Sequence, residues 1–185
     1  MRPQLGKPAI HHHLFLPGCS RFERTPGACM EFGLGQDGRF DCSGLVIDGM
    51  RKMLGLPGWA PEFRHTRQMV KALLAAGERP DTLDNVVRRR DEAAIGSLVF
   101  SHRQREAGGE IIWSIAHVSV LTDYADDGRP LFLQAQAGYE GKVVERPPYD
   151  LPQDTPERLV FNSAALAGLA IAHSPEIVPI KRVGC

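Results

Sequence analysis

The sequence predicts an α+β fold in which helices come first and an antiparallel sheet follows. Apolar residues recur near helical spacing in residues 42–54 and again in 64–77. After Gly96 the chain becomes rich in β-branched and aromatic residues, in segments separated by turn residues. Because the strands follow the helices instead of alternating with them, a parallel sheet of βαβ units is not expected.

Composition describes an ordinary globular chain and excludes two classes of partner. The chain has 185 residues, of which 43% are hydrophobic and 24% are charged. A chain of this size can bury a core of its own without disulfide or metal staples. Lysine plus arginine and aspartate plus glutamate both number 22, so no electrostatic case exists for a nucleic-acid or membrane partner.

Residues 1–38 show no sustained period and are rich in glycine, proline and histidine, so an irregular surface segment is expected, at least over 1–29. No secretory signal and no membrane span are expected, which predicts synthesis in the cytoplasm. Cysteines at 19, 29, 42 and 185 match no zinc pattern, and separate free thiols are favoured over a disulfide. Three consecutive histidines at 11–13 lack regularly spaced partner ligands, so neither a metal nor a cofactor is predicted.

Three helices are predicted in the first half of the chain. The first begins at Cys42, where Asp41 or Ser43 can cap it, and ends before Gly55. The second covers 64–77, with Gly77 as its stop signal. A third, short helix is predicted within 81–93, and its run of arginines is interpreted as a solvated face.

Five strands are predicted in the second half, and a small-residue tail follows them. Their segments are 97–101, 110–124, 130–137, 142–147 and 157–162. The tail, 163–185, is expected to be a short docked helix with an irregular end. The predicted organisation is therefore one domain over residues 1–162 and a C-terminal extension over 163–185.

Cys42 stands where a loop becomes a helix, in the stretch FDCSGLV. Unpaired backbone N–H groups and the positive end of the helix dipole favour a thiolate at such a position. The same N–H groups can hold a developing oxyanion. A small buried hydrophobe at the start of a helix is the other interpretation of this residue, so a partner base decides between the two.

His117 is the candidate base, because it lies in the strand segment IAHVSVLTD. Alternation along the next strand, PLFLQAQA, places Gln134 and Gln136 on one face. If the two strands pair through the ADDGRP turn, either glutamine can lie beside His117 and fix the imidazole tautomer. A cysteine, a histidine and an orienting polar residue form a thiol acyl-transfer unit.

The order FDCSGLV, GSLVFS, HVSVLTD and FLQA resembles the NlpC family of papain-like cell-wall cysteine peptidases over about residues 30–145. The resemblance implies a papain-like domain whose nucleophile helix packs on the C-terminal sheet. It makes Cys42 the nucleophile, His117 the base and Gln134 the third residue. It also implies that Asp41 and Ser43 bind the substrate amine, and that Met30 replaces a tyrosine that lines the site.

The reaction implied by the resemblance is hydrolysis of an amide bond in peptidoglycan stem peptides, without a cofactor. Because no signal peptide is expected, a phage tail or a secretion system would have to deliver the protein to the cell wall. Two alternatives stay open. One is another thiol acyl-transfer or amidase enzyme on the same fold, and the other is a catalytically silent structural module of a phage tail or effector.

Overall fold

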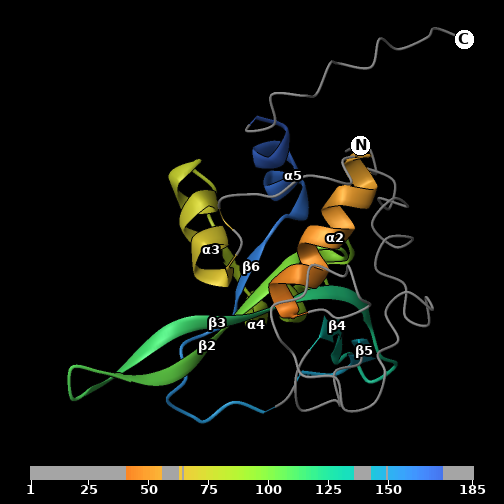
Figure 1. Cartoon of the computed structure of the whole chain (residues 1–185). Coiled ribbons are helices and arrows are strands. Elements are labelled where there is room, and N and C mark those ends of the chain that lie inside the picture. Colours follow the sequence, from red (N-terminus) through yellow and green to blue (C-terminus); the bar gives the residue numbers. More distant parts are fainter. Residues whose placement is uncertain (1–40, 56–62, 64, 136–142, 149, 173–185) are drawn as a thin grey trace, which may run out of the picture.

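The computed structural model describes residues 41–55, 63, 65–135, 143–148 and 150–172. The described residues form four α-helices and one open, six-stranded antiparallel sheet, which confirms the α+β class (Figure 1). The helices are α2 (Cys42–Leu54), α3 (Thr66–Ala75), α4 (Leu83–Arg89) and α5 (Ser163–Ala172). No helix within these ranges is long and apolar enough to cross a membrane.

The sheet has the strand order β1-β6-β2-β3-β4-β5, and each neighbouring pair is antiparallel. Strands β2, β3, β4 and β5 lie side by side in the order in which they follow one another along the chain. Adjacent pairing of this kind is expected when strands are joined by short turns. The first strand, which the sequence did not predict, pairs with β6 at the edge. The bounds are β1 (Asp81–Thr82), β2 (Leu98–Ala107), β3 (Glu110–Tyr124), β4 (Pro130–Ala135), β5 (Val143–Arg146) and β6 (Leu159–Phe161).

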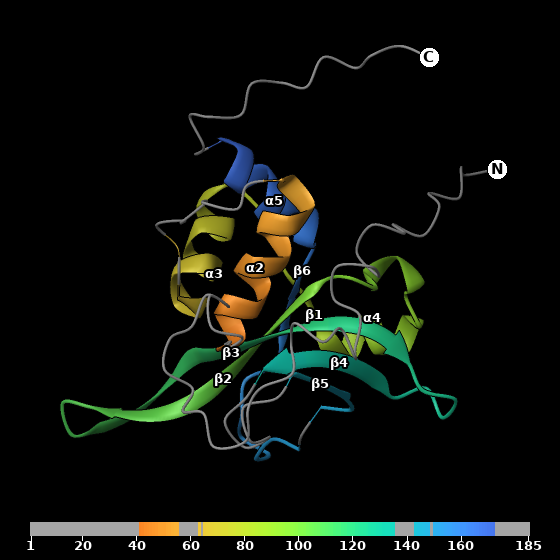
Figure 2. The same ribbon diagram turned by 45° about the vertical axis from the view of Figure 1, so that its right-hand side comes forward.

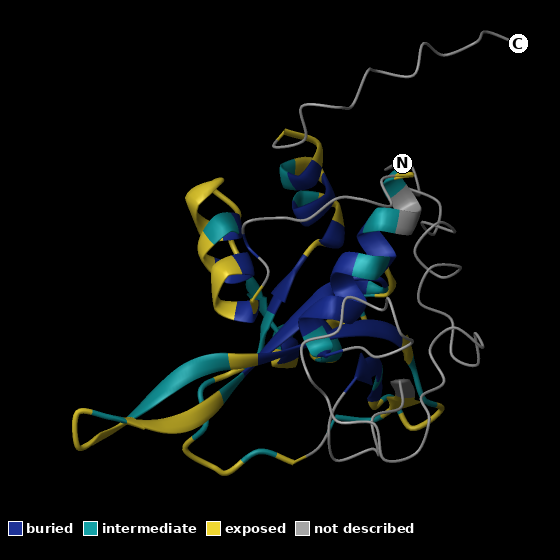
Figure 3. Cartoon of the chain, viewed as in Figure 1, coloured by how far each residue is buried: buried dark blue, intermediate teal, exposed yellow. Residues whose placement is uncertain are grey.

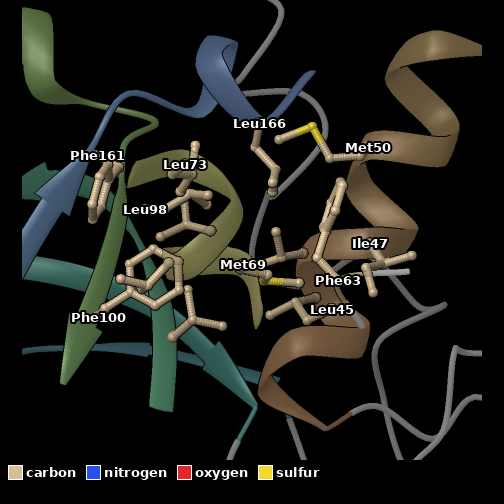
Figure 4. Packing of buried hydrophobic residues seen from close by; sticks show 14 of the residues in the cluster. Leu45, Ile47, Met50, Phe63, Met69, Leu73, Leu98, Phe100, Phe161 and Leu166 are labelled. Atoms are coloured by element: carbon tan, nitrogen blue, oxygen red, sulfur yellow. The ribbon is translucent and has the colours of Figure 1, made fainter. Parts of the chain in front are cut away.

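Helices α2, α3 and α5 cover one face of the sheet (Figure 2). Their apolar side chains pack with alternate residues of β2, β3 and β6, and Figure 4 shows the packing. Phe100 and Phe161 meet edge to face there, with ring centroids 5.8 Å apart. Leu166 and Ala170 of α5 are fully buried in the same cluster. The tail thus contributes a helix to the core, as far as residue 172.

Helix α4 packs on the opposite face through a smaller apolar cluster. Leu83 and Val86 of α4 meet Val99, Leu121 and Val160 of the sheet. These strand residues alternate with those that face α2, as the period of two in a strand requires. Thr82 caps α4 by accepting from the backbone N–H of Asn85. A short 3₁₀ helix, η2 (Glu92–Ala94), follows. The short helix predicted within 81–93 is confirmed as α4, and β1 and η2, which the sequence did not predict, flank it.

Strands β2 and β3 extend beyond the body of the sheet as a two-stranded arm (Figure 3). The sequence predicts a strand over 97–101 only, but β2 continues to Ala107 because β3 is long enough to pair with it throughout. Gly108 and Gly109 join the strands with φ of 62° and 82°. Positive φ at both central residues is the requirement of the tight hairpin turn whose twist matches the strands.

Candidate active site

Asp41 fixes the start of α2 and therefore the position of Cys42. Its side chain caps the helix by accepting from the backbone N–H of Gly44 and from the Ser43 hydroxyl, the latter at 3.0 Å. Both Asp41 and Ser43 are buried. Of the two caps that the sequence left open, Asp41 is the one used. Helix α2 ends at Gly55, whose φ of 67° is the left-handed conformation typical of a helix stop.

The Cys42 sulfur lies against backbone N–H groups from two elements. The N–H groups of Cys42 and Ser43 belong to the first turn of α2, and that of Val118 belongs to β3; all three lower the pKa of the thiol. Burial raises this pKa more strongly, and the Asp41 carboxylate adds to the increase. The net pKa is above the usual value of a cysteine. The expected depression is therefore wrong for this structure, because desolvation outweighs the helix terminus.

His117 and Gln134 form a buried hydrogen-bonded pair. The Nε2 atom of His117 lies 3.1 Å from the Oε1 atom of Gln134. Only 8% of His117 and 1% of Gln134 is exposed, so neither side chain can exchange this contact for water. A carbonyl oxygen only accepts, so the bond requires the tautomer with hydrogen on Nε2. The lone pair is then on Nδ1, where a base would act.

The pairing of β3 with its neighbours brings these side chains together. Leu121 pairs with Phe132 and Val120 with Leu133, so continued alternation puts Gln134 on the same face as His117. On the other side, His117 pairs with Ser101 of β2, and Ala116 is an extra residue in β3 where the register shifts. Such bulges re-aim the side chains beside them. This bulge was not predicted from the sequence.

Burial lowers the pKa of His117 to about 4. The Gln134 amide opposes the change, whereas the charges of Arg103 and Arg158 add to it. A raised thiol pKa beside a lowered imidazole pKa makes both groups neutral at pH 7. Val118 directly follows His117 in β3. The backbone N–H that contacts the Cys42 sulfur therefore belongs to the peptide group that joins the candidate base to Val118.

Several predicted positions lie outside the described residues: Met30, Gln136, and His11, His12 and His13. Within the described ranges, no group of three potential ligands could hold a metal ion. Three groups that act on the pKa values of the site were missed from the sequence: the Val118 N–H, Arg103 and Arg158. Alternation along an extended β2 would have put Arg103 on the same face as Ser101, had residues 102–107 been interpreted as strand.

Comparisons with known proteins assign this chain no relative: no protein-family model, no curated protein and no solved structure matches it. Its function therefore has to be argued from the placement of Cys42, His117 and Gln134.

Folding stability should fall in acid because His117 is buried as the neutral form. The unfolded chain takes up a proton below pH 6.5, but folded His117 does so only near pH 4. Between these values the unfolded state binds more protons, so stability decreases as pH falls, by about 3 kcal/mol in total. Urea unfolding of the wild type and of His117→Gln at pH 7 and pH 4.5 measures this contribution.

The comparison between the two proteins isolates His117 from the other titrating groups. Carboxylates and His102, whose pKa is also lowered by burial, contribute to the pH dependence of both proteins. The free energy of unfolding should therefore drop more in the wild type than in His117→Gln. If the free energy of unfolding decreased equally in the two proteins on acidification, His117 would not be buried as the neutral form.

Proposed function

We propose that this protein is an NlpC-like, papain-fold cysteine peptidase that hydrolyses an amide bond in peptidoglycan stem peptides. The observation that carries the proposal is the buried bond from His117 to Gln134, one residue away from the backbone N–H that meets the Cys42 sulfur. A histidine oriented by a neutral amide, beside a thiol at a helix N-terminus, supports thiol acyl transfer. The FDCSGLV and HVSV motifs support the cell-wall substrate.

The reaction starts from a neutral thiol and a neutral imidazole. Nδ1 of His117 takes the thiol proton as the sulfur attacks the amide carbon, and the carbonyl electrons move to oxygen. Backbone N–H groups at the start of α2 stabilise this oxyanion. The carbon–nitrogen bond then breaks, His117 protonates the departing amine, and a thioester forms on Cys42. Water, activated by the same imidazole, hydrolyses the thioester and releases the acid.

Asp41 and Ser43 are proposed to hold the free amine of the peptide. Asp41 also caps α2, so its carboxylate has two roles if the proposal holds. Met30 is proposed to line the same site. Delivery by a phage tail or a secretion system belongs to this proposal as well.

Digestion of purified peptidoglycan, followed by mass analysis of the fragments, tests the proposed function. The wild type should release fragments with a new amino end and a new carboxyl end inside the stem peptide. The Cys42→Ala variant should release none. If the wild type at high concentration leaves stem peptides intact, the cell-wall substrate is wrong.

A silent module is the second candidate, and one observation favours it. Burial raises the pKa of the Cys42 thiol, as it does for inert structural cysteines. A silent module would have no use for a buried imidazole held in one tautomer. Labelling with iodoacetamide at pH 7 separates the two candidates: in an enzyme the labelling of Cys42 should slow when His117 is replaced by alanine, whereas in a silent module it should not.

Gln134 should contribute chiefly orientation, because a neutral amide raises the pKa of His117 less than a carboxylate would. Gln134→Ala should lower kcat/KM by about 10–100-fold, equal to roughly 1.4–2.7 kcal/mol. Gln134→His and Gln134→Asn should restore part of this loss, since each can again accept from Nε2. Gln136→Ala is the matched control and should be nearly silent. A damaging Gln136→Ala beside a silent Gln134→Ala would reassign the third residue.

A further inference from the structure

The two-stranded arm has one edge that no described strand covers. Strand β3 begins at Glu110, but β4 pairs with it only from Val120 onwards. At the other edge of the arm, the chain before β6 lies beside β2, where the Gln104 amide donates to the Asp154 carboxylate at 3.4 Å. Figures 1 and 2 both show the arm projecting away from β4 and β5. Within the described residues, the outer edge of β3 along the arm, here called the β3 edge, is therefore available for backbone hydrogen bonds with another strand.

The residues along the β3 edge favour pairing with another strand. Residues 111–115 are Ile-Ile-Trp-Ser-Ile and include no charged residue, proline or glycine. Soluble proteins usually protect a free edge with charges, proline or a very short strand, because unpaired backbone groups are a template for pairing with other chains. Strand β5, at one side of the sheet, contains Glu145 and Arg146, and β1, at the other side, has only two residues. The β3 edge lacks this protection.

One face of the arm is apolar along β3 and polar along β2. Three apolar residues of β3 pair with three polar residues of β2, and residues that pair directly lie on the same face. The pairs are Ile111 with Glu106, Trp113 with Gln104, and Ile115 with His102. Ile115 also packs against the main core cluster, whereas Ile111 is 71% exposed. The apolar row therefore lies directly at the β3 edge, and its far end has no partner among the described residues.

The β3 edge is complementary to a second copy of itself. If two β3 strands pair antiparallel about Trp113, Ile111 of each copy lies opposite Ile115 of the other, and the two Trp113 side chains are neighbours. Apolar cross-strand pairs of this kind stabilise a sheet. The polar residues of both β2 strands then surround an apolar centre, as in other protein interfaces. On the opposite face of the sheet, Ile112 lies opposite Ser114.

The charges of the arm are compatible with this pairing. Residues 102–110 contain two arginines and two glutamates, so two arms carry no net charge that would make them repel each other. The register shift at Ala116 limits the regular part of the β3 edge to residues 110–115. A second copy matches this length, because it presents the same six residues in the opposite direction.

We propose that this protein associates with a second copy of itself through the β3 edge, so that the two arms form one four-stranded antiparallel sheet. The interface is short and belongs to the weak, transient class, with a dissociation constant on the order of 10–100 µM. The association does not depend on the proposed function, because it is argued from the arm alone.

Sedimentation of the full-length protein tests the association, over concentrations that span the expected dissociation constant and with a reducing agent that prevents disulfides. Ile111→Lys should fold, since the side chain is exposed, and it places a charge on the β3 edge. Symmetry introduces the change twice, so the dissociation constant should rise by about tenfold or more.

Gln104→Lys is the matched control, because it adds the same charge to the same face of the arm on β2. In the four-stranded sheet the two lysines would lie about 14 Å apart, which is three strand spacings and more than a Debye length. The dissociation constant of Gln104→Lys should therefore be close to that of the wild type.

Hydrogen exchange of the backbone amides locates the interface. In the wild type, amides within residues 111–115 should exchange more slowly at high protein concentration than at low concentration, and in Ile111→Lys at the same rate at both. A protein that is monomeric over the whole range would overturn the proposal, including one whose β3 edge binds an extended peptide of another protein. A dimer that Ile111→Lys leaves intact, or one without added protection in this segment, would overturn it as well.

Discussion

Replacing Cys42 or His117 with alanine is expected to abolish turnover of stem peptides, by at least about 10³-fold in kcat/KM for each variant. Cys42→Ala removes the atom that forms the thioester, and His117→Ala removes the base that takes the thiol proton. The rate losses caused by substitutions in one catalytic unit are not additive, so the double variant should be no slower than either single variant. Steady-state kinetics on stem peptides measures all three.

The fold should survive these changes, which separates lost chemistry from lost structure. Urea unfolding and far-ultraviolet circular dichroism should show folded proteins for both single variants. His117→Ala leaves Gln134 Oε1 buried without its donor, so some loss of stability is expected there. A folded His117→Ala variant with near-normal activity would show that another group is the base.

Phe100→Ala is expected to cost about 3–5 kcal/mol of unfolding free energy. The ring is fully buried in the cluster that α2, α3 and α5 form with the sheet, and it meets Phe161 edge to face, so its removal leaves a cavity and an unpartnered ring. Ile111 is the matched control on the same hairpin. Its side chain is 71% exposed, and Ile111→Ala should stay within about 0.5 kcal/mol of the wild type.

Urea unfolding monitored by circular dichroism checks both variants. The result also bears on the site, because β2 carries Phe100 on the face toward α2 and Ser101 on the face toward His117. If Phe100→Ala were as stable as Ile111→Ala, the packing of Phe100 in the core between the helices and the sheet would be wrong, and so would the strand register that places His117.

Local sequence signals were sufficient for the elements that carry the candidate triad. The start of α2 follows from a capping residue before an apolar period, and its end follows from Gly55. The strand containing His117 follows from β-branched alternation, and the short ADDGRP turn sets the pairing that brings Gln134 to the ring. Each of these depends on residues close in sequence, which is where pattern and propensity are informative.

Features that depend on distant residues could not be predicted in this way. The polar stretch HRQREA has no strand pattern of its own, and it becomes strand only because the long β3 is present to pair with it. The bulge at Ala116 arises from the same pairing. The pKa of Cys42 depends on how deeply α2 packs, so a sequence rule about helix termini gave the wrong direction.

The most direct test of the central claim is to trap the thioester on Cys42. Full-length protein is mixed with stem peptides, quenched in acid within milliseconds to seconds, and its Cys42 peptide is analysed by mass spectrometry. We expect an added mass equal to the acyl half of the cleaved peptide, which hydroxylamine removes, and we expect Cys42→Ala to show neither the adduct nor cleavage. Cleavage by Cys42→Ala at the wild-type rate would contradict the assignment of Cys42 as the nucleophile.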